Sequence, residues 1–408
     1  MFSVAVLFGS TLFPQNNGKC ATASLPEGPG KTLVETECTT CHELNLITDH
    51  YGHTPIDWKL TVERMVAAGA AIPKDQMTTV IDYLSKSFPE HDVPPAVILP
   101  GKTKVSFKEW TAPTIGSRPH DPLATRDGYL WYAGQYANAL GRVNTKTGEI
   151  KEFHLPNKGS APHGLVEDKD GKIWFTANWR GAIGKLDPKT GEFSEYKLPA
   201  DARDPHTPIF DQKGTFWFTV QNSNKVGRII PATGEIKLVD SPTKTSKPYG
   251  MVIDSKGTPY YCEWGAPKIA ALNPDTMAIK EWTLPHADSR PRRIAITKDD
   301  MIYYADFPRG VLGRLNPKTG AIKEWASPSG PKSEPYGITV VDGKIWYTES
   351  ATKPNTLVRF DPKTEKFESW AIPAGGGVVR NMMTTPDGSG IVMAESALNM
   401  VALATIAK

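Results

Sequence analysis

The sequence predicts a multidomain chain in which a small all-α domain precedes an all-β, seven-bladed propeller. Two observations support this prediction: a cysteine motif followed by helical patterns lies before residue 90, and a unit of about 43 residues repeats from residue 105 onward. The composition agrees, because 35 Gly and 35 Pro indicate many turns, and only Trp58 of the eleven tryptophans precedes residue 100. With 39% hydrophobic residues, 22% charged residues and a net charge of +3, the chain is not a disordered protein, a membrane bundle or a nucleic-acid-binding tail.

Residues 1–23 are expected to be a secretory signal peptide. Residues 2–13 form an apolar run that is shorter than the roughly 20 residues needed to span a bilayer. Ala21-Thr22-Ala23 then supplies the small-residue pattern of a cleavage site, although no basic segment precedes the run. We therefore expect the mature chain in the periplasm or outside the cell, without an integral membrane segment.

Residues 24–90 carry the motif Cys38-Thr39-Thr40-Cys41-His42, which is the pattern of covalent haem c attachment. Cys38 and Cys41 would bind the two vinyl groups of one haem, and His42 would be the proximal iron ligand. A thioredoxin-like pair would need a βαβ frame, whereas these flanks are helical. A zinc site would need a second ligand pair, and the chain has no second C-x-x-C motif.

Helices are expected over residues 54–69 and from Pro73 through Leu84, because each segment has an apolar stripe with a 3.6-residue period. Met65 is the favoured distal iron ligand, because it follows the motif by about one helix on an apolar face. Three other candidates remain open: Met77, His50 and His53. On CTTCH and the W-x6-M-x3-G run, residues 25–88 resemble small monohaem cytochrome c domains.

Residues 91–104 are expected to form a linker. This Pro-rich segment has no hydrophobic periodicity, and such a composition favours an extended, semi-rigid spacer.

Residues 105–408 contain seven repeats. An aromatic residue recurs every 43 positions, at Trp131, Trp174, Trp217, Tyr260, Tyr303 and Trp346. Four short strands fit into each repeat, which is the arithmetic of a propeller blade. The last repeat has room for only three strands, and residues 105–111 supply a strand with the Glu-Trp signature of the outermost position. Pairing the two would close the ring.

Two positions in each repeat break the symmetry at what should be the channel mouth. One follows the proline that starts the innermost strand, and its residues are His120, His163, His206, Tyr249, Arg292, Tyr336 and Arg380. The other ends the second strand, where the last four repeats carry Glu263, Asp306, Glu349 and Glu395. Such a polarised mouth could hold a metal ion, an acid–base pair or a small polar ligand, or its residues could simply bond loops around a wet channel.

The blade pattern, seen in the second repeat as PHGLVEDKDGKIWFTANWRGAIGKLDPKTGEFSEYKLP, is similar to that of the virginiamycin B (streptogramin B) lyases over residues 105–408. The resemblance implies a seven-bladed propeller and a metal-assisted, histidine-centred elimination that opens a lactone, with Mg²⁺ as cofactor. The matching positions are Arg292, Glu334, Glu349 and Ala351. Glu334 and Glu349 would be catalytic, whereas the two histidines of the family pattern are absent, which weakens the lyase interpretation.

Three functions follow from these observations. The favoured one is a c-type cytochrome that transfers electrons through one haem to a periplasmic redox partner, with the propeller as a substrate- or partner-binding module. The second is a lyase-like enzyme that carries a haem domain. The third is an oxidoreductase with its substrate on the propeller face, which would need a second redox centre that the sequence does not display.

Overall fold

The computed structural model describes residues 25–38, 47, 54–67, 70–90 and 93–407. The chain divides into two compact units, Met1–His91 and Asp92–Lys408. In the first unit, helix α1 (Lys31–Glu37) precedes α3 (Pro55–Ala67), the 3₁₀ turn η2 (Lys74–Gln76) and α4 (Met77–Ser87). No helix in the described part of the chain is both long and apolar enough to cross a bilayer.

The helices of the first unit pack around one apolar cluster. Val34, Trp58 and Val80 are its most buried members, and Trp58 donates a hydrogen bond from its indole nitrogen to the carbonyl of Phe88 at 2.7 Å. Asp57 and Thr54 cap the start of α3, since the Asp57 amide donates to the Thr54 hydroxyl at 3.2 Å. The two expected helices thus exist as α3 and α4, with the second beginning as the 3₁₀ turn.

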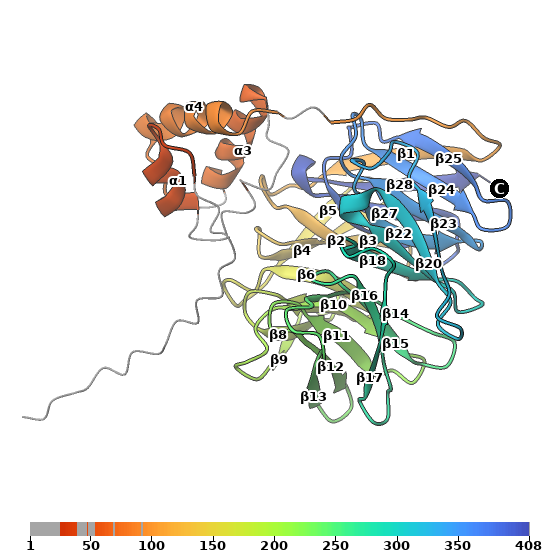
Figure 1. The fold of residues 1–408 in the computed structure, drawn as a ribbon. Helices are drawn as coiled ribbons and strands as arrows, with labels where there is room; N and C mark the ends of the chain where they lie inside the picture. The colour runs from red at the N-terminus through yellow and green to blue at the C-terminus, as the bar shows by residue number, and fades with distance from the viewer. Residues whose placement is uncertain (1–24, 39–46, 48–53, 68–69, 91–92, 408) are drawn as a thin grey trace, which may run out of the picture. The chain divides into compact units, whose positions relative to one another are not determined.

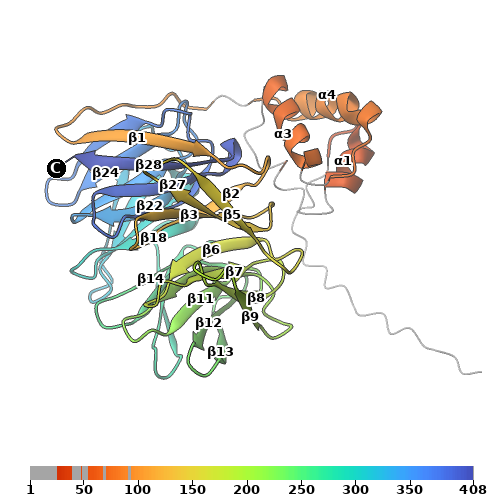
Figure 2. The ribbon, with the colours of Figure 1, turned by 180° about the vertical axis from the view of Figure 1, so that it is seen from behind.

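The second unit consists of seven four-stranded antiparallel sheets (Figures 1 and 2). The first sheet holds β2 (Pro119–Ala124), β3 (Tyr129–Gly134), β4 (Ala139–Asn144) and β5 (Ile150–His154). The second holds β6 (Pro162–Glu167), β7 (Ile173–Ala177), β8 (Ala182–Leu186) and β9 (Phe193–Lys197). The third holds β10 (Pro205–Phe210), β11 (Phe216–Val220), β12 (Lys225–Ile230) and β13 (Glu235–Asp240).

The remaining sheets repeat this order. The fourth holds β14 (Pro248–Ile253), β15 (Pro259–Glu263), β16 (Lys268–Leu272) and β17 (Ile279–Thr283). The fifth holds β18 (Pro291–Ile296), β19 (Ile302–Asp306), β20 (Val311–Leu315) and β21 (Ile322–Ala326). The sixth holds β22 (Pro335–Val341), β23 (Lys344–Glu349), β24 (Thr356–Asp361) and β25 (Lys366–Ala371). The seventh holds β26 (Val379–Thr384), β27 (Gly390–Glu395), β28 (Met400–Ala407) and β1 (Lys104–Thr111).

The seventh sheet closes the propeller, as the sequence predicts. Strand β1 pairs with β28 along its whole length, from Lys104 opposite Ala407 to Thr111 opposite Met400. The innermost strands of neighbouring sheets contact one another around a full circle, with β2 touching both β6 and β26. The fold is therefore a seven-bladed β-propeller in which no blade is left with an open edge at the junction of first and last strands.

The recurrent aromatic residue lies at the centre of each blade. Trp131, Trp174 and Trp346 are only 1% exposed, and Trp174 stacks on Tyr196 of the outermost strand with ring centroids 5.3 Å apart. This stacking explains why an aromatic residue follows glutamate in the fourth strand of most repeats. The glycine of the third strand is equally fixed by packing, because a Cβ on Gly141 would lie 1.9 Å from the ring of Tyr132.

The Pro-rich segment before β1 is extended but is not a free spacer. Pro95 forms a parallel bridge with Lys353, and Ser369 of β25 donates to the Val97 carbonyl at 2.6 Å and accepts from the Leu99 amide at 2.8 Å. The segment from residue 93 onward therefore covers the outer strand of the sixth blade and belongs to the propeller unit.

Candidate active site at the channel mouth

A backbone irregularity in every innermost strand builds the mouth of the channel. Each of these seven strands pairs normally at its first residue and then shifts register, as between Pro205 and Pro208 of β10. Such bulges re-aim side chains near functional sites. The residue directly after the first one lies at this shift in each strand, and these are the seven residues that the sequence assigns to the mouth.

Four of the mouth residues form a continuous series of aromatic contacts. The ring centroids of His120 and His163 are 3.7 Å apart, those of His163 and His206 are 3.9 Å apart, and those of His206 and Tyr249 are 4.0 Å apart. All four side chains are buried. Tyr249 then shares a 2.6 Å hydrogen bond with Tyr336 across the mouth. The structure thus brings together the three histidines that the sequence singles out.

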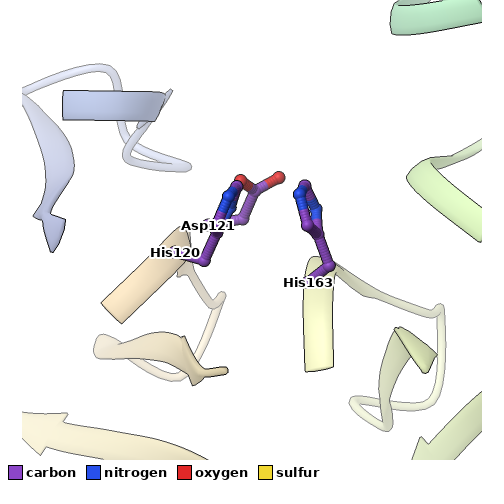
Figure 3. Close-up of side chains that lie close together, drawn as sticks. All are labelled: His120, Asp121 and His163. Carbon is purple, nitrogen blue, oxygen red and sulfur yellow. The ribbon is translucent and has the colours of Figure 1, made fainter. Parts of the chain in front are cut away.

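His120 is held by the carboxylate of Asp121, with 2.9 Å between Nδ1 and Oδ1 (Figure 3). Arg293 donates to both oxygens of that carboxylate, at 2.9 and 3.2 Å, and Asn381 donates to Oδ2 at 2.9 Å. A carboxylate that pairs with an arginine acts as a hydrogen-bond acceptor, so Nδ1 of His120 carries the proton. The lone pair of His120 is then on Nε2, as in a general base oriented by an acidic partner.

Arg293 also closes the channel below the histidines. It comes from β18, on the far side of the ring from β2, and its guanidinium also donates to the Thr207 hydroxyl at 3.0 Å and the Arg380 carbonyl at 3.2 Å. Beyond it lies a cavity of about 390 Å³, lined by Asp121 and Arg293 at one end and by apolar side chains such as Met251 and Met382. Asp121, Thr207, Arg293 and Asn381, which line this cavity, therefore form a polar floor beneath the mouth residues.

These floor residues are absent from the sequence-based candidates. Asp121, Thr207, Arg293 and Asn381 all occupy the position after the predicted mouth residue, where other innermost strands carry glycine. The sequence did contain one signal for two of them, because Asp121 and Arg293 are charged residues within strands that otherwise have to be buried. The pairing itself could not be inferred, because Asp121 and Arg293 are 172 residues apart and meet only across the closed ring.

The three mouth histidines are neutral. Burial lowers the pKa of each of them well below its usual range, and the charges of Arg118 and Arg380 lower that of His120 further. A metal ion is a poor occupant, although ligand atoms of His120, Asp121 and His163 lie within 4.8 Å of one another. Asp121 already bonds Arg293 and Asn381, and cationic arginines surround the site.

The strand-end carboxylates lie at the mouth end, opposite the first residues of their innermost strands, but they are buried and bond away from the channel. Glu349 is completely buried, and its two oxygens accept hydrogen bonds from Ser327, Ser329 and Thr356 at 2.6–2.8 Å. These partners belong to strand β24 and to the loop between blades, rather than to the innermost strands. Glu349 is therefore a structural acceptor inside the sixth blade.

Glu263, Asp306 and Glu395 are buried in the same way. Each ends the second strand of its blade, and its partners come from the outer strands, from the loops between blades or, for Asp306, from the turn between β19 and β20. Glu263 accepts from the Ser241 hydroxyl at 2.9 Å, and Asp306 pairs with Arg309 at 2.9 Å. Burial and the neighbouring Glu109 of β1 raise the pKa of Glu395 to about 8. These carboxylates organise the blades and do not join the ring of mouth residues.

The positions matched to the lyase site do not fit a Mg²⁺ ion. Glu349 has no acceptor capacity to spare, and Ala351 offers no ligand atom. Arg292 adds a cation, which packs over Trp264 at 4.1 Å. Burial raises the pKa of Glu334 to about 8, so this carboxyl is largely protonated at neutral pH. These residues therefore do not form a Mg²⁺ site.

Of the predicted haem residues, Cys38 and Met65 are described by the structure. Cys38 follows α1 as a half-buried free thiol, packs against the apolar cluster of the first unit, and has a pKa raised by burial to about 11. Met65 is half-buried on α3, whereas Met77 packs directly against the cluster. Cys41, His42, His50 and His53 lie outside the described residues, as does the predicted signal peptide up to residue 23.

The fold and the mouth define a class: a seven-bladed propeller whose channel carries a cluster of polar side chains at one end. Residues 100–315 match the virginiamycin B lyase family model, and the chain belongs to the virginiamycin B lyase family. No curated protein matches the chain. Among solved structures, a streptogramin B lyase is 25% identical with a TM-score of 0.67, over 74% of this chain and 98% of that one. A catalytically inactive virginiamycin B lyase from Staphylococcus aureus with quinupristin is 27% identical with a TM-score of 0.67, over 74% and 99% of the two chains.

Proposed function

We propose that the channel mouth is the active site of an elimination enzyme of the lyase class, with His120 as its general base. The observation that supports this proposal is the buried pair of His120 and Asp121, 2.9 Å apart. In this proposal, His120 takes the role of the histidines that the family pattern would place at positions 292 and 351, where this chain has Arg292 and Ala351. The base has thus moved from blades five and six to blade one within the same channel mouth.

The proposed reaction needs no redox partner. His120 Nε2 takes a proton from the carbon adjacent to an electron-withdrawing group, the C–H electron pair forms a C=C bond, and the neighbouring C–O bond breaks with its electrons on the leaving oxygen. Asp121 stabilises the imidazolium, which returns the proton to that oxygen. General-base catalysis of this kind contributes roughly 10²–10⁴-fold in rate.

We expect His120→Ala to lower turnover by about 10²–10⁴-fold. The assay offers quinupristin and a panel of β-acyloxy and β-aryloxy carboxylates in the presence of a chelator, and follows the ultraviolet absorbance of the new double bond. His154→Ala is the matched control, because His154 is an exposed histidine on the outer strand β5. Turnover of none of these compounds, or turnover that needs Mg²⁺ and survives in His120→Ala, would contradict the proposal.

The first unit supports a second function, which is electron transfer through one covalently bound haem c to a redox partner in the periplasm. The motif at residues 38–42 is specific for this attachment, and the half-buried Cys38 thiol against an apolar cluster fits one of the two thioether bonds. Cys41 would form the other, with His42 and Met65 as axial ligands. When bound, the haem would supply one-electron chemistry, for which the elimination has no use.

Co-expression with a haem c maturation system in the periplasm tests this second function. We expect a pyridine haemochrome spectrum typical of haem c and a haem that stays with the chain in a denaturing gel. Cys38→Ser should remove at least one thioether bond and shift the haemochrome band to longer wavelength, while Cys262→Ser, in the buried core of the fourth blade, should leave it unchanged. Absence of covalent haem from the wild-type chain would refute haem attachment.

A further inference from the structure

The arginines around the mouth are not neutralised. Arg118, Arg292 and Arg380 are half-buried, and none of them forms an ion pair with a carboxylate within the described residues. Arg293, Arg309 and Arg359 each pair with a carboxylate, whereas Arg142, Arg228 and Arg314 lie singly over aromatic rings of their own blades. The mouth therefore carries uncompensated positive charge in a desolvated place, which is costly unless an anion is present.

Arg118 and Arg380 lie on neighbouring blades, because Arg118 directly precedes β2, Arg380 is the second residue of β26, and these two innermost strands contact each other. His120 is the second residue of β2. Burial lowers the pKa of Arg118, and the nearby charge of Arg380 lowers it further. Arg118 uses a single nitrogen to donate to Gln135 at 2.7 Å and to Tyr136 at 2.8 Å, so most of its five donors remain for a ligand. The Nε of Arg380 is buried without a hydrogen-bond partner. This geometry suits the two oxygens of one carboxylate.

An aromatic surface begins beside Arg118. Its guanidinium packs over the ring of Tyr136 at 4.7 Å, and Tyr136 contacts Trp179 with centroids 5.8 Å apart. Tyr136 follows β3 and Trp179 follows β7, and both strands end beside the proline that starts the innermost strand, at the mouth end of the blade. Trp179 is 44% exposed, whereas the central tryptophans of the blades are buried. An exposed indole at the edge of a binding basin is a typical stacking surface for a planar ligand.

We infer that the mouth binds an aromatic carboxylate, with the carboxylate between Arg118 and Arg380 and the ring on Tyr136 and Trp179. The aromatic carboxylate would be the substrate class of the proposed elimination site. Its binding does not depend on that proposal, whereas its conversion to product does. A carboxylate at this place lies beside His120, whose charge-free imidazole does not compete with the arginines for it.

Isothermal titration of the full chain with 3-phenylpropionate tests the inference. We expect binding that weakens about 10–100-fold in Arg118→Met and in Arg380→Met, because each variant removes a charged hydrogen-bond donor. Trp179→Ala should weaken binding about tenfold through loss of stacking. Arg126→Met is the matched control, because Arg126 lies in the loop between β2 and β3 at the other end of the first blade and pairs with Glu167.

The ligand panel separates the two parts of the claim. Benzyl alcohol, which lacks the charge, and acetate and inorganic phosphate, which lack the ring, should each bind more weakly than 3-phenylpropionate. Equal binding of benzyl alcohol, of acetate or of phosphate, unchanged affinity in the arginine variants, or no binding of 3-phenylpropionate would overturn the inference. His120→Ala should still bind 3-phenylpropionate. If the wild-type chain binds it but turns over no substrate, only the proposed elimination is refuted. If the wild-type chain turns over only uncharged compounds, only the aromatic carboxylate is refuted as the substrate class.

Discussion

Arg293→Met is expected to lower the free energy of unfolding by about 3–5 kcal/mol, because it leaves the buried charge of Asp121 without its main partner. Arg293 and Asp121 are 3% and 1% exposed, so water cannot replace the two hydrogen bonds between them. Asn381 and His120 would remain as neutral partners of the carboxylate. Urea denaturation followed by tryptophan fluorescence measures the loss.

A double variant distinguishes loss of the ion pair from loss of packing. Asp121→Leu combined with Arg293→Met should recover most of the stability, because an apolar pair of similar volume avoids the desolvation of both charges. If Arg293→Met alone costs less than about 1 kcal/mol, the range of an exposed ion pair, the cross-channel pair does not form. The double variant also loses the acceptor of His120 Nδ1, so its turnover should stay low while its stability recovers.

The propeller could be predicted from the sequence because its determinants are local and repeated. The central aromatic residue, the turn glycines and the Glu-aromatic pair recur with the period of one blade, so each repeat reports the same packing independently. The closing strand was predictable for the same reason, since Trp110 carries the signature of the outermost position and is 8% exposed in the structure. Periodicity thus gives both the number of blades and their closure.

The floor of the mouth could not be predicted in this way. Which side chains of different blades meet depends on ring closure and on the bulge after each first residue, and neither leaves a local pattern. The strand-end carboxylates were also beyond prediction, because their position in the repeat does not reveal what they bond to. Glu349 bonds Thr356 inside its own blade, and Glu395 lies beside Glu109 of the closing strand. The Pro-rich segment was expected as a spacer, and its contact with Ser369 depends on a serine that stands where five of the other six blades carry glutamate.

Glu395→Gln is expected to remove part of the pH dependence of stability between about pH 4.5 and 8. Glu395 is completely buried in the closing blade, and both its oxygens lack a hydrogen-bond donor within the described residues. In the fourth blade, Lys268 pairs with the corresponding outer glutamate, Glu281, whereas Met400 occupies the position of that lysine in the closing blade. Within the part of the chain that the structure describes, Glu395 thus lies beside Glu109 without a lysine between them, and burial together with this neighbouring carboxyl raises the pKa of Glu395.

The sign of the effect follows from the direction of the pKa shift. The pKa of Glu395 is raised from 4.5 to about 8 in the folded chain, so the folded state keeps a proton that the unfolded chain releases within this interval. The contribution of Glu395 to the free energy of unfolding should then be fully present below pH 4.5 and be lost as the pH rises toward 8, by an amount on the order of a few kcal/mol for a buried group. Glu395→Gln keeps the neutral shape at every pH, so the variant should be more stable than the wild type at pH 8 and similar to it at pH 4.5.

Glu263 and Glu334 have pKa values raised to about 8 as well, so part of the pH dependence of stability should remain in the variant. Thermal unfolding across this interval measures the difference, with the exposed Glu149→Gln as control; an identical slope in Glu395→Gln and the wild type would show that the closing blade holds no shared proton.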